Sequence, residues 1–195
     1  MGDPKFPRRK YDRPSHPWDG ERIKAENELL NKYGLKNKKE LWRAQSFLSH
    51  IRARARELQA LVRYGNKQAE KERDELIARL GRLGLLPVEG ATLDDVLALD
   101  VEAVLSRRLQ TMVYVKGLSF NPRQARQFIV HGHLAVGGRA VRAPGRLVSR
   151  AEEASIVYDA RSPIANDLHP ARPRVQEITV PAGDAPKGDE GGGGS

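Results

Sequence analysis

Apolar residues recur at steps of three and four through the first third of the chain, and this spacing predicts helices. The longest predicted helix runs from Lys38 to about Tyr64. One of its faces carries an apolar stripe, made of Leu41, Ala44, Leu48, Ile51, Ala55, Leu58 and Val62. Such a stripe is typical of a helix that packs against a core. A shorter helix is expected from Gly20 to Tyr33, with Gly34 ending it.

The stretch from Asn66 to Leu83 mixes acidic and basic side chains with a few apolar ones. This pattern predicts a solvent-facing helix supported by ion pairs between residues four apart, and no site is assigned to it. A loop is expected from Gly84 to Gly90. The run Thr92-Leu93-Asp94-Asp95 has the spacing of a capping box, which predicts a short helix to about Leu99.

A new unit of helices and short strands is predicted from residue 101 onward. Its first helix is expected from Val101 to Gly117, with Leu105 on its core side. A second helix is expected after Asn121, a good N-cap, with Pro122 in the first helical position and Gln124 folding back in a capping box. Gly132 can adopt the left-handed conformation that ends this helix.

After that second helix, the spacing of apolar residues changes from helical to alternating along the chain. Leu134 and Val136 share one face, and Gly137-Gly138 is a two-residue hairpin signal before Arg139. Two further short strands are expected, at residues 146–148 and 155–158. The strands are predicted to form a small twisted sheet that packs on the two helices.

These elements predict an α+β fold. Its four expected segments are an extended basic arm at 1–19, a mostly helical domain at 20–100, a domain of two short helices on a small twisted antiparallel sheet at 101–165, and an extended, flexible tail at 166–195. The tail is expected to be flexible because its last part has no apolar periodicity and ends in Gly-Gly-Gly-Gly-Ser. The arm is rich in proline and basic residues and cannot bury much apolar surface on its own.

Composition narrows the class of partner. The 195 residues carry a net charge of +9, with a pI near 10.0, which favours nucleic acid or an anionic membrane. No apolar run approaches the roughly 20 residues that span a bilayer, and no secretory leader is visible, so no membrane partner is expected. Because the chain has no cysteine, disulfides and thiolate zinc sites are excluded, which fits a reducing cytoplasm.

The positive charge is unevenly distributed along the chain. Residues 1–64 hold 16 Lys and Arg against 8 Asp and Glu, and residues 106–162 hold ten against three. Nine of those ten are arginines, whose planar guanidinium suits phosphate and can stack on bases. Residues 65–105 carry a net charge of −4 and are expected to face solvent or a protein neighbour. We therefore expect a polyanion on the two basic segments, the alternative being a solvated basic surface.

Catalytic and metal-binding patterns are weak. His131-Gly132-His133 could suggest a metal pair, but no third carboxylate or thiol lies nearby in sequence, so a role at a helix end and in contact with the polyanion is preferred. Gly137-Gly138 is too short for a phosphate-binding loop. Asp94-Asp95 lies in a capping context. The chain is therefore expected to work by binding and not as an enzyme, with no metal, cofactor or small-molecule substrate.

The candidate contacts to a polyanion are cationic and hydrogen-bonding side chains in the two basic segments. In the second unit they are Arg107, Arg108, Gln110, Lys116, Ser119, Arg123, Gln124, Arg126, Gln127, His131, His133 and Arg139. In the first half they are Arg8, Arg9, Lys10, Arg43, Arg52, Arg54 and Arg56. Arg126, Gln127, His131 and His133 are the central candidates.

Several runs resemble known motifs. These runs are Arg107-Arg108-Leu109-Gln110, Ser119 with Ala125-Arg126-Gln127, Ile129-Val130-His131-Gly132-His133 and Gly137-Gly138, and together they resemble the S-four RNA-binding domain. Three earlier runs resemble the archaeal and eukaryotic branch of the small-subunit ribosomal protein S-four family: Phe6-Pro7-Arg8-Arg9-Lys10-Tyr11, Ser15-His16-Pro17-Trp18 and Leu41-Trp42-Arg43. The resemblance covers about residues 1 to 170.

The resemblance implies a structural protein of the small ribosomal subunit. Members bind small-subunit ribosomal RNA at a multi-helix junction, act early in assembly and support translational accuracy. The implied partners are that RNA, neighbouring small-subunit proteins including the S-five family member, and messenger RNA at its entry region, on the cytoplasmic ribosome. The cysteine cluster of some bacterial relatives is absent, so no metal is carried over.

Two other classes of function share this architecture. One is an RNA-binding factor of a nucleolar or assembly particle. The other is an RNA-modifying enzyme, such as a pseudouridine synthase, with an appended S-four domain. Such enzymes carry a separate catalytic domain of substantial size, for which about 100 helical residues without a catalytic constellation leave no room.

Overall fold

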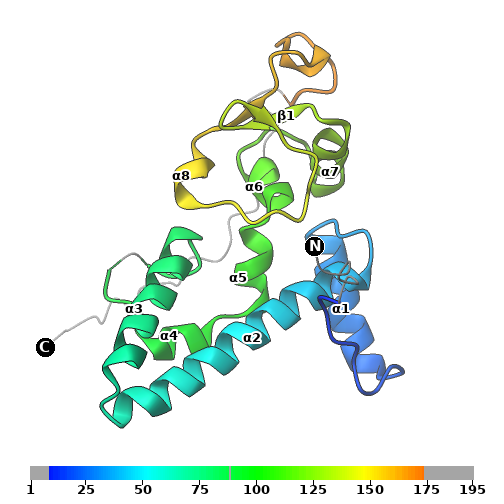
Figure 1. Ribbon diagram of the computed structural model, residues 1–195. Helices are drawn as coiled ribbons and strands as arrows, with labels where there is room; N and C mark the ends of the chain where they lie inside the picture. The colour runs from blue at the N-terminus through cyan, green and yellow to red at the C-terminus, as the bar shows by residue number, and fades with distance from the viewer. Residues whose placement is uncertain (1–8, 88, 174–195) are drawn as a thin grey trace, which may run out of the picture.

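Two hydrophobic cores divide the chain in the computed structural model, which describes residues 9–87 and 89–173. The first core is built by five helices: α1 (Gly20–Lys32), α2 (Lys38–Arg63), α3 (Lys67–Arg82), α4 (Leu93–Ala98) and α5 (Val101–Ser106). The second core joins α6 (Leu109–Val115) and α7 (Pro122–His131) to a small sheet. Figure 1 shows α5 rising from α2 towards the second core.

α2 organises the first core, as its apolar stripe predicts. Leu41, Leu48, Ala55 and Leu58 are at most 2% exposed, and α3, α4 and α5 all pack against this helix. The Asn37 side chain accepts a hydrogen bond from the Glu40 N–H and so caps the N-terminus of α2. The predicted boundaries of α1, α2 and α3 are confirmed to within two residues.

The prediction of one helix from Val101 to Gly117 is wrong. The helix breaks at Arg107-Arg108, because this backbone pairs with the segment that follows the hairpin. The Val148 N–H donates to the Arg107 carbonyl at 3.0 Å, and the Leu109 N–H donates to the Arg146 carbonyl at 2.8 Å. Leu105, expected in the second unit, belongs to the first core. The two cores therefore meet at Arg107-Arg108.

α7 has the local structure that its sequence predicts. The Asn121 side chain accepts from the Gln124 N–H, Pro122 takes the first position, and Gly132 ends the helix at φ +79°. The capping box is different from the expected one. The Gln124 side-chain oxygen accepts from the Phe120 N–H at 2.7 Å, one residue further back than the N-cap.

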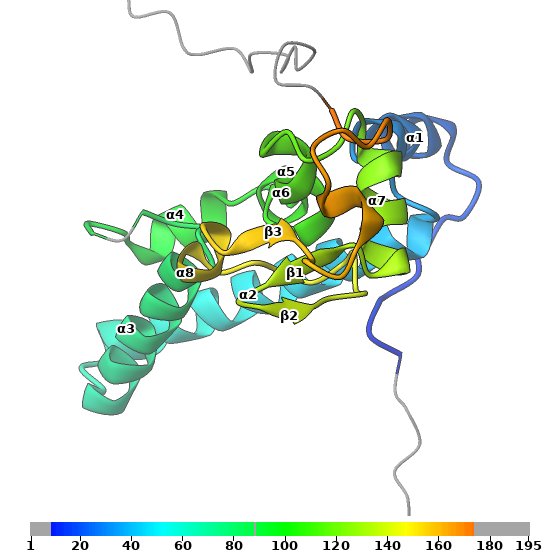
Figure 2. The ribbon, with the colours of Figure 1, turned by 90° about the horizontal axis from the view of Figure 1, so that it is seen from above.

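The sheet contains three short strands in the order β2-β1-β3, all antiparallel (Figure 2). They are β1 (Leu134–Val136), β2 (Arg139–Ala140) and β3 (Ile156–Tyr158). The hairpin at Gly137-Gly138 and the last strand are confirmed. The strand expected at 146–148 is absent from this described sheet, since Leu147 makes only an isolated bridge with Arg108.

Two short helices were not predicted. α8 (Arg150–Glu153) begins with a capping box of Ser149 and Glu152, and η1 (Pro163–Ala165) places buried Ile164 in the second core. None of the helices in the described residues is long and apolar enough to cross a bilayer.

The ion pairs of α3 differ from the expected spacing of four residues. Among the described residues, Arg73 pairs with adjacent Asp74, and Glu72 pairs across to Arg54 on α2. The mixed charges of α3 therefore tie it partly to α2.

Candidate nucleic-acid interface

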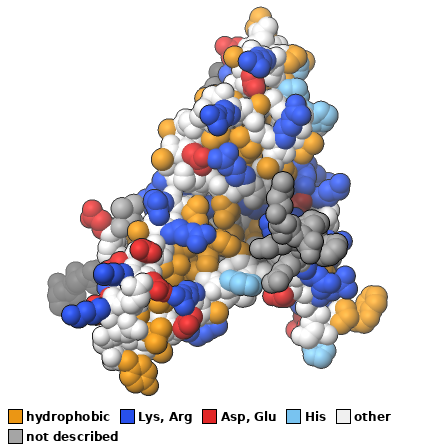
Figure 3. Space-filling model, in the orientation of Figure 1, with side chains coloured by type: hydrophobic (Ala, Val, Ile, Leu, Met, Phe, Trp, Pro, Cys, Tyr) orange, Lys and Arg blue, Asp and Glu red, His pale blue; other side chains and the backbone are white. Residues whose placement is uncertain are grey.

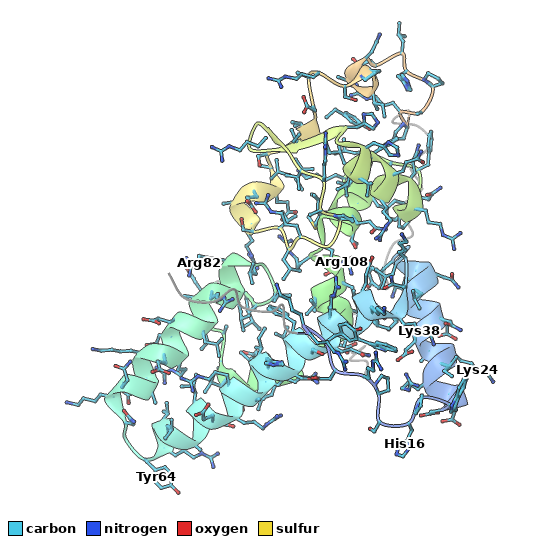
Figure 4. All side chains as sticks on the ribbon, turned by 45° about the vertical axis from the view of Figure 1, so that its right-hand side comes forward. His16, Lys24, Lys38, Tyr64, Arg82 and Arg108 are labelled. Atoms are coloured by element: carbon cyan, nitrogen blue, oxygen red, sulfur yellow. The ribbon has the colours of Figure 1, made fainter. Side chains whose placement is uncertain are left out.

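Glu40 on α2 lies at the junction of the two cores and forms ion pairs with two arginines of the second core. Arg108 Nη2 is 2.7 Å from Glu40 Oε2, and Arg126 Nη2 is 2.5 Å from Glu40 Oε1. We call these three residues the Glu40 cluster. The Arg108 side chain is only 7% exposed and the Glu40 side chain 14%. Figure 4 shows Arg108 where the second core meets α2.

The electrostatics of the Glu40 cluster favour its charged form. Burial opposes ionisation of Glu40, yet the guanidinium groups of Arg126 and Arg108 outweigh burial and hold the pKa of the carboxyl below its usual value. Burial lowers the pKa of Arg108, and Glu40 counteracts this. The cluster therefore joins the cores by charge-assisted hydrogen bonds.

Gln110 adds a second link between the cores. Its side chain is 1% exposed, and its amide nitrogen donates to the Gly34 carbonyl at 2.9 Å and to the Pro122 carbonyl at 2.8 Å. Arg126 Nη1 donates to the Gln110 side-chain oxygen at 3.3 Å. Gln110 and Arg126 are both among the predicted RNA contacts, and in the structure both make hydrogen bonds within the protein.

Three other candidates in the second unit also make hydrogen bonds within the protein, and a fourth, Ser119, is buried. Arg107 donates to the carbonyls of Leu83 and Val148 and pairs with Glu153 at 3.0 Å. The Lys116 ammonium donates to the Glu153 carbonyl. Gln124 donates to the Ala171 carbonyl at 2.9 Å, and Ser119 is 1% exposed. These residues support the fold at the ends of α6 and α7.

A second group of candidates remains exposed on the surface of the second core. Its members are Arg123, Gln127, His131 and Arg139, and exposed Arg142 lies next to Gly132 at the end of α7. The Arg142 Nε would be 3.0 Å from a Cβ on Gly132, so its guanidinium covers the end of α7. We call these five residues the α7 surface.

The two histidines at the end of α7 stack on one another. Their ring centroids are 5.9 Å apart with an interplanar angle of 9°, and His133 also meets Phe128 edge-on. His133 Nδ1 lies 2.9 Å from Ser162 Oγ, and burial, with His131 and His169 nearby, lowers the pKa of His133. The described residues contain no group of three or more His, Asp or Glu that could hold a metal. The pair thus presents a flat aromatic surface beside basic residues.

The candidates of the first half lie along α2 and the arm. Arg43 and Arg56 are exposed, Arg54 pairs with Glu57 and Glu72, and Arg52 donates to the Leu99 carbonyl. Arg8 lies outside the described residues.

The described part of the arm packs against α2. The Asp12 N–H donates to Ser46 Oγ at 2.9 Å, and the Tyr11 ring lies 6.1 Å from that of Trp42. Arg9 lies over the Tyr11 ring, and Arg9 and Lys10 are both exposed. These contacts bring the two basic residues beside α2.

A hollow runs along the inner side of α2, and two adjoining cavities form it. One, of about 430 Å³, lies at the junction and is lined by Glu40, Arg43, Ala44, Phe47, Val104, Arg108, Arg126, Pro144, Gly145 and Leu147. The other, of about 740 Å³, is lined by Arg9, Lys10, Tyr11, Asp12, Arg43, Ser46, Phe47, His50, Ile51, Arg54, Leu76, Arg79 and Leu80. We call the two together the concave groove. Figure 3 shows apolar side chains gathered in the hollow, with Lys and Arg around them.

Arg79 is the basic residue of this groove that sequence reasoning missed. It lies on α3, to which no site was assigned, and yet it faces the same cavity as Arg43 and Arg54 of α2. Its sequence neighbours gave no signal, because Arg79 belongs to a run of mixed charge. The groove arises from the antiparallel packing of α3 on α2, which the sequence alone does not place in space.

Comparisons with a family model and with known proteins agree on one family. Residues 107–153 match the model of the S4 domain. A small ribosomal subunit protein uS4 of Thermoplasma acidophilum is 53% identical over 182 residues, which cover 93% of this chain and 89% of the relative. The uS4 protein of Methanococcus aeolicus is 52% identical over 172 residues, 88% of this chain and 96% of the relative. The domain match begins at Arg107, where the two cores meet.

Proposed function

The chain belongs to the family of small ribosomal subunit protein uS4, and on that premise we propose that it binds small-subunit ribosomal RNA at a junction of several helices. The family predicted from the motifs is confirmed. Its members are ribosomal proteins and not enzymes, so the RNA-modifying alternative is set aside.

The observation that carries the proposal is the presence of exposed basic groups on both cores. The α7 surface lies on the second core, and Arg9, Lys10, Arg43 and Arg56 lie on or beside α2. The Glu40 cluster fixes the relative orientation of the two sets. A protein of this form can grip two RNA helices and hold the angle between them.

The two sets would supply affinity through phosphate contacts. Duplex RNA hides its base edges in a deep groove, so specificity would come from shape, sugar hydroxyls and the fixed distance between the sets. The more acidic region of α3 and α4 would face solvent or a protein neighbour.

We assign the chain an early role in small-subunit assembly on the cytoplasmic ribosome, and a role in translational accuracy. Its proposed neighbours are other small-subunit proteins, among them the S-five family member, and messenger RNA at the entry region. A nucleolar or assembly-particle factor would leave before the subunit matures. Sedimentation of the chain with purified small subunits at high salt is the result that favours the resident protein.

The RNA site can be tested by hydroxyl-radical footprinting. The full chain is bound to small-subunit ribosomal RNA of Thermoplasma acidophilum, the source of a 53% identical relative. Protected nucleotides are expected in at least two helices that meet at one junction. The double variant Arg123→Ala/Arg139→Ala should lose one set of protections, whereas Arg63→Ala, an exposed change on α2, should lose none. Protection of a single isolated helix would refute the bipartite arrangement.

A further inference from the structure

The concave groove combines an apolar floor with a basic rim, and the duplex contacts described above make no use of the apolar floor. We infer that this groove binds an unpaired segment of the small-subunit ribosomal RNA, with its bases against the floor and its phosphates at the rim. The inference rests on the proposed function, because it names a second class of RNA structure for the same protein.

The charge of the groove requires an anion. Its lining carries seven Lys and Arg side chains: Arg9, Lys10, Arg43, Arg54, Arg79, Arg108 and Arg126. Among the residues that the structure describes, only two acidic side chains, Glu40 and Asp12, belong to the same lining. Glu40 is already shared by two arginines, so most of the rim is left without a counter-charge from the lining. A concave positive surface of this kind concentrates polyanions.

The exposed rim can accept phosphates at small cost. Arg54 pairs with Glu57 and Glu72, but its side chain is 44% exposed, and exposed ion pairs contribute little to stability. A phosphate can therefore replace these partners without loss of the fold. Arg43 and Arg79 are exposed on either side of the same cavity.

The floor favours unpaired bases over a duplex. Phe47 and Leu76 are half-buried, and Tyr11 lines the groove at the end nearest the arm. The outside of an RNA duplex presents phosphates and hydroxyls, which gain nothing from apolar side chains. The faces of unpaired bases stack on aromatic rings, and single-stranded nucleic acids are bound in this way by basic grooves with aromatic floors.

The continuity of the groove indicates a chain and not a single small ligand. The two cavities share Arg43 and Phe47, so they form one path from the Glu40 cluster to the arm. At the upper end this path reaches Arg126 on α7, the helix that also carries the α7 surface. An unpaired strand leaving a helix bound at the α7 surface can enter the groove directly. Because the groove reaches the helix that carries the α7 surface, its occupant is the same ribosomal RNA that is bound there.

Photo-crosslinking at the centre of the groove tests the inference. Phe47 of the full chain is replaced by p-benzoylphenylalanine, and the protein is assembled with Thermoplasma acidophilum small-subunit ribosomal RNA and its total small-subunit proteins. Crosslinked nucleotides are mapped by reverse transcription, and their pairing in the free RNA is measured by chemical probing. We expect crosslinks to a short run of unpaired nucleotides.

Matched arginine variants test the rim. The double variant Arg43→Ala/Arg79→Ala is made in the chain that carries the photoreactive residue at position 47. It should lower the crosslink yield at least about tenfold, because each substitution removes a phosphate contact beside the stacked bases. The control Arg63→Ala/Arg73→Ala removes the same charge from a separate cavity, lined by Gln59, Val62 and Thr92, and should leave the yield unchanged. Equal yields for the two double variants would overturn the inference.

A second probe separates this inference from the proposed function. Val130, half exposed on α7 beside the α7 surface, receives the same photoreactive residue. Crosslinks to ribosomal RNA from position 130 but not from 47 would overturn the groove inference and leave the proposed function standing. Crosslinks from position 47 to paired nucleotides, messenger RNA, another protein or a second copy of this chain would also overturn the groove inference alone. Failure at both positions, with no RNA bound, would overturn both.

Discussion

Arg126 on α7 faces Glu40 on α2 across the junction of the two cores, and its two terminal nitrogens lie 2.5 and 3.1 Å from the two carboxylate oxygens. The two residues are 86 positions apart in the sequence. This fork-to-fork contact orients a planar guanidinium against a planar carboxylate. The residue expected to bind phosphate is thus first of all a connection between the two halves of the protein.

Glu40→Ala should lower the free energy of unfolding by roughly 3–5 kcal/mol, because it leaves Arg108 and Arg126 close together without their shared counter-charge. Urea denaturation measures the change. Glu57→Ala is the control on the same helix, and it should cost less than about 1 kcal/mol because that side chain is 58% exposed. Similar losses for the two variants would mean that the Glu40 cluster does not join the cores.

The stability supplied by Glu40 should depend on pH. Its folded-state pKa lies below the ordinary value of 4.5, so its stabilising contribution is complete above that pH and is lost as the pH falls through the folded-state pKa. The difference in unfolding free energy between wild type and Glu40→Gln should therefore be constant near neutral pH and shrink below about pH 4.5. A difference that stays constant down to pH 3 would contradict the lowered pKa.

Gly34→Ala should destabilise the protein more than its backbone conformation alone requires. Gly34 has φ +59°, and a Cβ there would lie 2.9 Å from Pro122 Cβ and 3.1 Å from the Pro122 carbonyl carbon. Gly65→Ala is the matched control, because Gly65 has φ +73° and open space around it. Gly65→Ala should lower the free energy of unfolding by about 1–2 kcal/mol through backbone strain alone, and Gly34→Ala should lower it clearly more. Thermal unfolding of the two variants measures the difference. Equal losses would show that α7 can move away at no cost.

Phe128→Ala should remove a central part of the second core. Its ring is 4% exposed and packs edge-on with His133, so the expected loss is roughly 3–5 kcal/mol. Phe120→Ala deletes the same side chain at a position that is 42% exposed and should cost about 1 kcal/mol or less. Calorimetric melting of both variants provides the comparison, and a reversed order would place the core elsewhere.

The affinity for ribosomal RNA should fall steeply with salt. A plot of the logarithm of the binding constant against the logarithm of the salt concentration should have a negative slope. If about six to ten phosphates are neutralised, each adds about −0.7 to −0.9 to this slope. Filter binding between about 50 and 200 mM salt measures this slope. A nearly flat line would exclude phosphate contacts as the source of affinity.

Local features of the fold could be predicted from the sequence because their causes are local. The stripe from Leu41 to Leu58, the N-cap at Asn121 and the left-handed Gly132 each depend on residues a few positions apart. The unpredicted α8 belongs in the same class, since Ser149 and Glu152 have capping-box spacing that could have indicated it.

Features with distant causes could not be predicted in this way. The break at Arg107-Arg108 depends on the backbone near Val148, and the position of Arg126 depends on Glu40. Charge counting correctly shows that arginines are in excess, but it does not show which of them already have a carboxylate or carbonyl partner. For that reason the α7 surface could be named only once the packing of the cores was known.

The three-stranded sheet has a consequence for the protein before it meets any RNA. β1, the buried strand, lies in the middle, and the edges are β2 with two residues and β3 with three. Exposed strand edges are where copies of a chain pair and aggregate, and edges this short offer few hydrogen bonds to a neighbour. This sheet therefore gives copies of the chain that have not bound RNA little opportunity to pair with one another.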